Sequence, residues 1–202
     1  QVLLDGNVEA EGEEFFSLGS FEVTTAGDRM LYGVDVAGDE RYTVRVRDLV
    51  TGEQLPDVIP DTFAGATFSP DGRFIVYTTV DDAWRPDTVW LHELGTPVED
   101  DVKLFHEPDE RFWLGAGFTR SDRYLVIGMG SSITSEEWLV DADDLRSAPR
   151  LVWPRREGVE YDSSHAVIDG EDVLFILHND GALDFELVKV SVFLASFTGL
   201  YF

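Results

Sequence analysis

The chain has 202 residues, of which 40 are acidic and 15 basic, so its formal net charge is −25. A surface of this sign repels nucleic acid and anionic membranes at long range, so we expect neither as a partner and expect attraction to basic peptides or cations instead. The absence of cysteine excludes disulfides and Cys-based zinc sites, and it favours a cytoplasmic location.

A turn followed at once by a hydrophobic, β-branched run recurs four times along the chain. The copies are TTAGDRMLYGV at 24–34, FSPDGRFIVYTT at 68–79, FTRSDRYLVIGM at 118–129 and the weaker VIDGEDVLFIL at 167–177. The bulky residues that open these strands are spaced by about 44, 50 and 49 residues, and repeats of this length are typical of propellers and solenoids.

A second element lies between these copies and alternates between apolar and polar residues. It appears as YTVRVRDLVTGE at 42–53, DTVWLHELGTP at 87–97, SEEWLVDADDL at 135–145 and FELVKVSV at 185–192. Such alternation predicts a strand with one buried face. Short return strands, LPDVI, DVKLF and PRLVW, follow the first three copies. Each repeat is therefore predicted to be three or four antiparallel strands.

These repeats predict an all-β fold, a β-propeller of four-stranded antiparallel blades with about four blades present. The partial propeller spans 1–192, with repeats near 17–60, 61–108, 109–156 and 157–192, and a leading strand is expected at 1–5. The apolar tail 193–202 falls outside the pattern. Four blades in an open arc leave unpaired strand edges, which would favour self-association. Alternatively, the four blades close on themselves, or the tail fills the gap.

No catalytic residue is predicted from the sequence. The G-x-S-x-G pentapeptide of an α/β-hydrolase does not occur. The four histidines are His92, His106, His165 and His178, two in each of two repeats. None has a second histidine at i+4, as a zincin helix requires. Although Ser163 and Ser164 precede His165, neighbours in sequence do not make a catalytic triad.

Acidic clusters at 35–40, 99–101 and 141–144 supply oxygen ligands. None has the spacing of an EF-hand loop, so we interpret them as solvated turns and expect no metal and no cofactor. A pair of glycosidase carboxylates that converge on a propeller axis remains open, because the sequence offers no way to choose such a pair.

The segment PRREGVEYDSSH at 154–165 contains the candidate site residues Arg155, Arg156, Glu160, Tyr161 and His165. Adjacent arginines could present guanidinium groups to a peptide carboxylate or to an acidic face of a partner domain. Alternatively, they pair with nearby acids of the same chain and relieve its surplus negative charge.

Four segments carry a resemblance to a known family. They are RYTVRVRDLVTGEQLPD, VWLHELGTPVEDDVKLFHEPDERFWLG, ITSEEWLVDADD and LVWPRREGVEYDSSH, in this order. Together they resemble the N-terminal propeller of the prolyl oligopeptidase family of serine peptidases. The stretches at 92–97 and 154–165 are the specific parts, whereas the S-P-D-G-R turn is common to many propellers.

The resemblance implies a seven-bladed propeller that admits short, flexible peptides to a C-terminal α/β-hydrolase domain. The branch of the family that the chain resembles cleaves after Lys or Arg. We expect the hydrolase domain to lie outside this chain, so no catalytic residue can be carried over, and the residues of 154–165 would serve substrate gating or interdomain contact. The alternatives are a stand-alone propeller scaffold for protein or peptide binding, and a propeller enzyme, such as a lactonase or glycosidase, that acts at its own axis.

Overall fold

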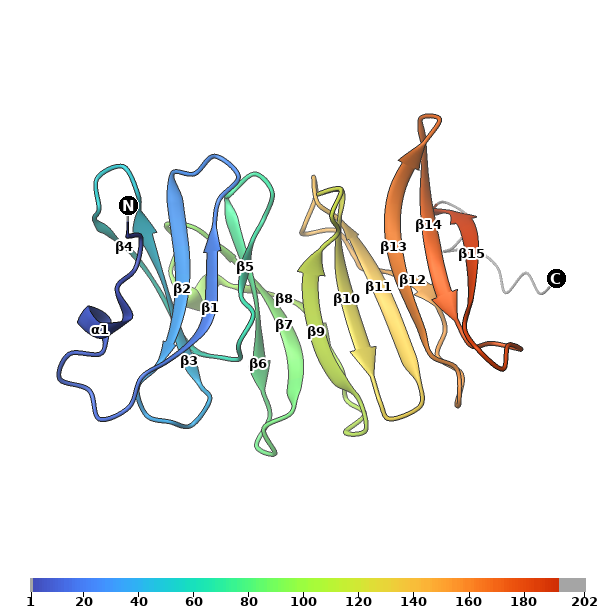
Figure 1. Ribbon diagram of the computed structural model, residues 1–202, viewed down its shortest axis with the longest axis horizontal. Coiled ribbons are helices and arrows are strands. Elements are labelled where there is room, and N and C mark those ends of the chain that lie inside the picture. Colours follow the sequence, from blue (N-terminus) through green and yellow to red (C-terminus); the bar gives the residue numbers. More distant parts are fainter. Residues whose placement is uncertain (1, 193–202) are drawn as a thin grey trace. The chain divides into compact units, whose positions relative to one another are not determined.

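A computed structural model describes residues 2–192, and nearly all of its regular structure is β (Figure 1). It divides into two compact units, Gln1–Lys103 and Leu104–Phe202, which are described separately below. The elements are α1 (Gly6–Glu9), β1 (Ser17–Val23), β2 (Arg29–Asp35), β3 (Tyr42–Asp48), β4 (Gln54–Thr62), β5 (Thr67–Phe68), β6 (Phe74–Val80), β7 (Pro86–Glu93), η1 (Val98–Asp100), β8 (Val102–His106), β9 (Trp113–Phe118), β10 (Tyr124–Gly130), β11 (Ser135–Asp141), β12 (Arg150–Trp153), β13 (Tyr161–Ile168), β14 (Glu171–His178) and β15 (Glu186–Ser191).

Two antiparallel sheets have their strands in sequence order, β1-β2-β3-β4 and β5-β6-β7-β8. These strands lie in the first unit, except that β8 begins there and crosses its boundary after Lys103. Strand β3 alternates between buried and less buried residues, whereas β2 and β6 each have four consecutive buried residues. The two sheets share a core. Its members are each at most 6% exposed: Leu31, Val44, Val46, Ile59, Ala66, Phe68, Ile75 and Tyr77. A four-stranded sheet cannot bury such a face alone, so the neighbouring sheet is part of its stability.

The second unit contains the sheet β9-β10-β11-β12 and the sheet β13-β14-β15. Its core is again shared between the sheets, through Tyr124, Leu139, Val152, Tyr161, Leu174, Ile176 and Val192. The expected all-β architecture of four-stranded antiparallel sheets is confirmed for three sheets, and the described part of the fourth has three strands. The apolar tail 193–202 lies outside the described residues.

The same turn connects the first two strands of three sheets. In each, a hydroxyl oxygen accepts a hydrogen bond from the backbone N–H five residues later, at 3.2, 2.9 and 3.2 Å; the pairs are Thr24–Arg29, Ser69–Phe74 and Thr119–Tyr124. Short hydroxyl side chains favour turns because they can satisfy backbone donors locally. The recurrent turn-and-strand motif of the sequence therefore has one structural cause.

The N-terminal segment differs from the expectation of a leading strand at 1–5. No strand is present among residues 2–5; instead, a single turn of helix, α1, begins directly after Asp5. The Asp5 carboxylate accepts a hydrogen bond from Asn7 N at 3.0 Å, which caps the helix and competes with extended backbone. Glu9 then forms an ion pair with Arg47 at 2.8 Å. No helix among residues 2–192 is long and apolar enough to cross a membrane.

Candidate functional site

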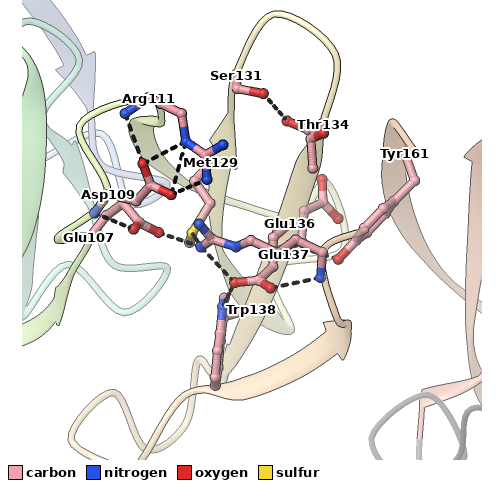
Figure 2. A network of polar contacts seen from close by, with 11 residues as sticks. Glu107, Asp109, Arg111, Met129, Ser131, Thr134, Glu136, Glu137, Trp138 and Tyr161 are labelled. Carbon is pink, nitrogen blue, oxygen red and sulfur yellow. Dashed lines mark hydrogen bonds and ion pairs between the residues drawn. The ribbon is translucent and has the colours of Figure 1, made fainter. Parts of the chain in front are cut away.

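Arg155 follows β12 and contacts two buried carboxylates, Glu107 and Glu136. Both acids are labelled in Figure 2. Its Nη2 donates to Glu136 Oε1 at 2.9 Å and to Glu107 Oε2, while its backbone N–H donates to Glu136 Oε2 at 2.9 Å. The guanidinium carbon lies 4.0 Å from the centroid of the Phe112 ring, and Nη2 lies 3.1 Å from Met129 Sδ. The cation is thus held by hydrogen bonds and by stacking on an aromatic face.

The charges of this cluster stabilise one another. Burial acts to raise the pKa of Glu136, but hydrogen bonds from Arg155 outweigh it, so the pKa lies below its usual value. Burial likewise acts to lower the pKa of Arg155, yet Glu136 and Glu107 raise it. Glu107 is 2% exposed and Glu136 7% exposed. Arg155 therefore neutralises acids of its own chain, as the second of the two interpretations expects.

Arg156 and Glu160 lie in different surroundings. Arg156 forms an ion pair with Asp180, and the two side chains are 41% and 36% exposed. Glu160 N donates to Asn179 Oδ1 at 2.8 Å, and the Glu160 carbonyl accepts from Asn179 N at 3.2 Å. These contacts join the start of β13 to the turn after β14, on the surface of the unit.

Tyr161 completes an irregular pairing between β11 and β12. The register between these strands shifts between Glu137 and Trp138. At this point the Tyr161 hydroxyl accepts from Glu137 N at 2.7 Å and from Trp153 N at 3.2 Å, and it donates to Trp153 O at 2.8 Å. Burial raises the pKa of the phenol well above its usual value. The hydroxyl therefore satisfies backbone groups that the bulge leaves unpaired.

His165 connects the two sheets of the second unit. Its Nδ1 lies 2.6 Å from Ser121 Oγ, and its Nε2 lies 3.0 Å from Asp172 Oδ1. Its ring also meets the Tyr124 ring edge-on, with centroids 4.9 Å apart. The serine is thus neither of the two that precede His165 in sequence. Because Ser121 Oγ is also 2.9 Å from Thr119 Oγ1, in the turn between β9 and β10, we interpret this group as a clamp between sheets.

A groove of about 440 Å³ lies in the second unit beside Tyr161 and His165, and it is lined in part by glycines of β9 and β10. Gly128 is the register partner of both Gly115 and Glu137, so these three residues lie side by side across β9, β10 and β11. A Cβ added at Gly115 or Gly117 would meet no atom within 4 Å. The groove exists because these positions carry no side chain to fill it.

Glu137 places a carboxyl group in the groove although the residue is only 7% exposed. Its Oε2 accepts hydrogen bonds from Ser163 N, at 3.1 Å, and from Ser163 Oγ. Burial raises the pKa of Glu137 to about 7, despite the hydrogen bonds from Ser163, and the neighbouring charge of Asp162 adds to the effect. Close to neutral pH this carboxyl is therefore poised between its acid and its anion.

The structure does not bring the five predicted residues onto one site. Tyr161, Ser163 and His165 occupy every second position of β13 and share the face toward the neighbouring sheet. Arg155 and Arg156, by contrast, bind separate acids. Their role in gating or interdomain contact stays a prediction. The sequence reasoning missed Glu137 and the groove. The available signal was the pair of glycine-alternating strands, WLGAGF and YLVIGMG.

The sequence HELGTP at 92–97, in the first unit, begins with a buried histidine. His92 is fully buried, and its ring nitrogens lie 2.7 Å from Asp101 Oδ1 and 3.1 Å from Asp57 Oδ1. Gly95 N donates to Asp57 Oδ1 at 2.5 Å, and the Tyr77 hydroxyl donates to Asp101 Oδ2 at 2.7 Å. Burial is the main cause that raises the pKa of Tyr77, and the hydrogen bond to the Asp101 carboxylate and its charge raise it further. These residues form an internal polar network around the imidazole.

The acidic cluster at 35–40 is a self-contained turn. The Asp35 carboxylate accepts hydrogen bonds from the backbone N–H groups of Ala37, Gly38 and Glu40, each at 2.8 Å. Burial acts to raise the pKa of Asp35, but these donors outweigh it and lower the pKa. Among residues 2–192, no group of three or more His, Asp or Glu side chains is arranged to hold a metal ion.

Comparison with known proteins relates nearly the whole chain to one family. Residues 1–194 match the model of the prolyl oligopeptidase N-terminal β-propeller domain. Protease 2 of Moraxella lacunata is 37% identical over 94% of this chain, and dipeptidyl aminopeptidase BI of Pseudoxanthomonas mexicana is 32% identical over 93%. The chain spans only 27% and 26% of these two relatives, respectively.

Solved structures give the same relation. Oligopeptidase B from Leishmania major superposes with a TM-score of 0.88 at 27% identity, over 98% of this chain and 28% of that one. Oligopeptidase B from Trypanosoma brucei gives 0.85 at 30% identity, over 98% and 27%. The agreement covers both sequence and fold, so this chain belongs to the prolyl oligopeptidase family and corresponds to its N-terminal β-propeller domain.

Proposed function

We propose that this chain is the non-catalytic propeller portion of a serine oligopeptidase resembling oligopeptidase B, and that it gates access of short basic peptides to a C-terminal α/β-hydrolase domain. Cleavage after Lys or Arg would take place in that second domain. The observation that carries the proposal is the match of residues 1–194 to the family propeller, together with relatives of which the chain spans about a quarter.

The charge of the chain supports a preference for basic peptides. A net charge of −25 creates a negative potential that extends about 10 Å into solvent at 0.1 M salt and attracts cations within that range. The same potential repels acidic peptides. Electrostatic attraction of this kind acts on the rate of encounter, so it should appear in kcat/KM rather than in kcat.

The test uses the longer protein in which this chain precedes a hydrolase domain. We would measure kcat/KM for matched peptides with Arg, Lys or citrulline at the cleaved position, at about 20 mM and about 500 mM NaCl. We expect the value for the Arg peptide to fall several-fold with salt and the citrulline peptide to be a poor substrate at both concentrations. A salt-independent kcat/KM for the Arg peptide would contradict the steering role.

Gating is tested separately with peptide length. Arg peptides of increasing length should be cleaved progressively more slowly by the complete protein, and removal of the propeller should abolish this dependence. If the longer protein binds peptides but does not cleave them, the peptidase proposal is wrong and the alternative of a stand-alone binding scaffold takes its place. A cytoplasmic location and self-association through open strand edges stay predictions, which cell fractionation and light scattering would test.

A further inference from the structure

We propose that the groove between β9–β11 and β13 binds the cationic end of a lysine or arginine side chain of a peptide, with Glu137 Oε1 as the principal acceptor. This inference deepens the proposed function and rests on it for the choice of a basic peptide as ligand. It is otherwise argued from the groove alone, and it concerns a binding site rather than a catalytic one.

The space is sufficient and is open to a ligand. The groove measures about 440 Å³, within the range of roughly 300–1,000 Å³ of small-molecule sites. Its floor is the row Gly115–Gly128–Glu137 across three strands, where the two glycines leave the carboxyl uncovered by neighbouring side chains. An extended alkyl stem, such as that of Lys or Arg, would pass over this floor with its charged end toward the carboxyl.

The acceptor capacity of Glu137 is only partly used. Ser163 supplies both donors to Oε2, and no hydrogen bond from residues 2–192 reaches Oε1. A buried carboxylate is ordinarily paired with a cation or with several donors, because an unpaired charge is costly to desolvate. Glu137 has only the neutral donors of one serine, so a ligand cation would supply the missing partner.

The other charged groups of the groove are compatible with this ligand. Asp162 adds a second negative charge near Glu137. Arg120 also lines the groove but is exposed, and within the described chain no ion pair within 4.0 Å joins it to Glu137. His165 is engaged on both ring nitrogens, by Ser121 and Asp172. The acceptors that face the cavity therefore favour a cation over an anion.

Binding should be linked to the release of a proton. Because the empty groove holds the pKa of Glu137 at about 7, most molecules carry a neutral carboxyl at pH 6 and a carboxylate at pH 8. A cation binds the ionised form, so its apparent affinity equals the intrinsic affinity multiplied by the fraction of molecules in which Glu137 is ionised. We expect the affinity to rise about tenfold between pH 6 and pH 8.

The experiment measures binding to the 202-residue chain by calorimetry, with acetyl-Gly-Arg-Gly-amide and its Lys, citrulline and norleucine analogues as probes. We expect the Arg and Lys peptides to bind and the two neutral peptides to bind at least tenfold more weakly. Glu137→Gln keeps an acceptor for Ser163 and removes the charge, so we expect the folded variant to lose about tenfold or more in affinity for the cations.

Matched variants separate the groove from the general negative charge. Glu171→Gln removes the same charge at an exposed position outside the groove lining and should change affinity less than twofold. Gly117→Leu fills the groove, at a position where a Cβ meets nothing within 4 Å, and should abolish binding with all charges kept. Circular dichroism verifies that each variant is folded.

Three results would overturn the inference: equal binding of norleucine and Lys peptides, equal losses in the Glu137 and Glu171 variants, or an affinity that does not change from pH 6 to pH 8. The proposed function fails independently of these results. If the groove binds cations but the longer protein shows no preference for basic substrates, only the peptidase proposal is wrong. If salt-dependent cleavage occurs but cations do not bind at Glu137, only the inference about the groove is wrong.

Discussion

Replacing Arg155 by methionine should destabilise the second unit by leaving two buried carboxylates without their cation. Breaking a buried ion pair by removing one partner costs about 3–5 kcal/mol. The Arg155 side chain is 28% exposed, whereas those of Glu107 and Glu136 are 3% and 9% exposed. Because solvent screens the exposed part of the guanidinium, we expect the lower end of that range, about 3 kcal/mol at pH 7.5.

The penalty should depend on pH. In the native protein the pKa of Glu136 is lowered, so its contribution is present above the unfolded pKa of about 4.3 and is lost as pH falls through the lower folded value. Without the Arg155 guanidinium, Glu136 keeps only the hydrogen bonds from Trp138 Nε1 and from the backbone N–H of residue 155. We expect burial to outweigh these two donors and to raise the pKa of Glu136 above the unfolded value. The Arg155→Met variant then regains stability as pH falls through that raised value. The difference in free energy of unfolding between the native protein and the variant should therefore narrow between pH 8 and pH 5.

Urea unfolding followed by tryptophan fluorescence and circular dichroism would measure both effects. Arg155→Lys keeps the charge but loses the planar fork and its stacking on Phe112, and should cost about 1 kcal/mol. Arg120→Met, at an exposed position, should change stability by less than about 0.5 kcal/mol. A loss below about 1 kcal/mol for Arg155→Met at pH 7.5, or an equal loss at pH 5, would refute the reasoning.

Two further substitutions test the packing of the sheets. Tyr161→Phe leaves the backbone groups at the β11–β12 bulge without their partner and should cost about 2 kcal/mol in thermal unfolding, whereas Tyr124→Phe is the matched control and should cost far less. Gly19→Ala places a Cβ 2.3 Å from Tyr42 Cε1 and should lower the free energy of unfolding by about 1–3 kcal/mol. Adding Tyr42→Leu should restore part of that stability. Gly115→Ala is the control and should be tolerated, because the added Cβ meets nothing within 4 Å.

The geometry of His165 needs a structural rather than a catalytic explanation. Serine, histidine and aspartate lie in line, as in a hydrolase triad, since Ser121 Oγ and Asp172 Oδ1 contact opposite ring nitrogens. However, Ser121 contacts Thr119, the hydroxyl residue of the β9–β10 turn. The same kind of hydroxyl-based turn recurs in two of the other sheets. The imidazole thus connects this turn to the start of β14 and fixes one sheet of the unit against the next.

Much of the fold follows from the sequence alone. Strands and turns are local features: alternation selects the buried face of a strand, and hydroxyl residues such as Ser69 satisfy a backbone donor only five positions away. Because these signals recur at a nearly constant spacing, the sequence predicted antiparallel sheets whose strands follow chain order. It also predicted correctly that the chain resembles the prolyl oligopeptidase propeller.

The polar partners were decided only by the tertiary structure. Alternation shows which face of a strand is buried but not which residue of another strand lies opposite. Arg155 thus finds Glu107, 48 residues earlier, and Tyr161 finds the backbone of Glu137, 24 residues earlier. Glu137 itself appeared to be an ordinary polar position of an alternating strand. It became a buried acid in a groove because β13 of the next sheet covers it, while the adjacent glycines leave one side open.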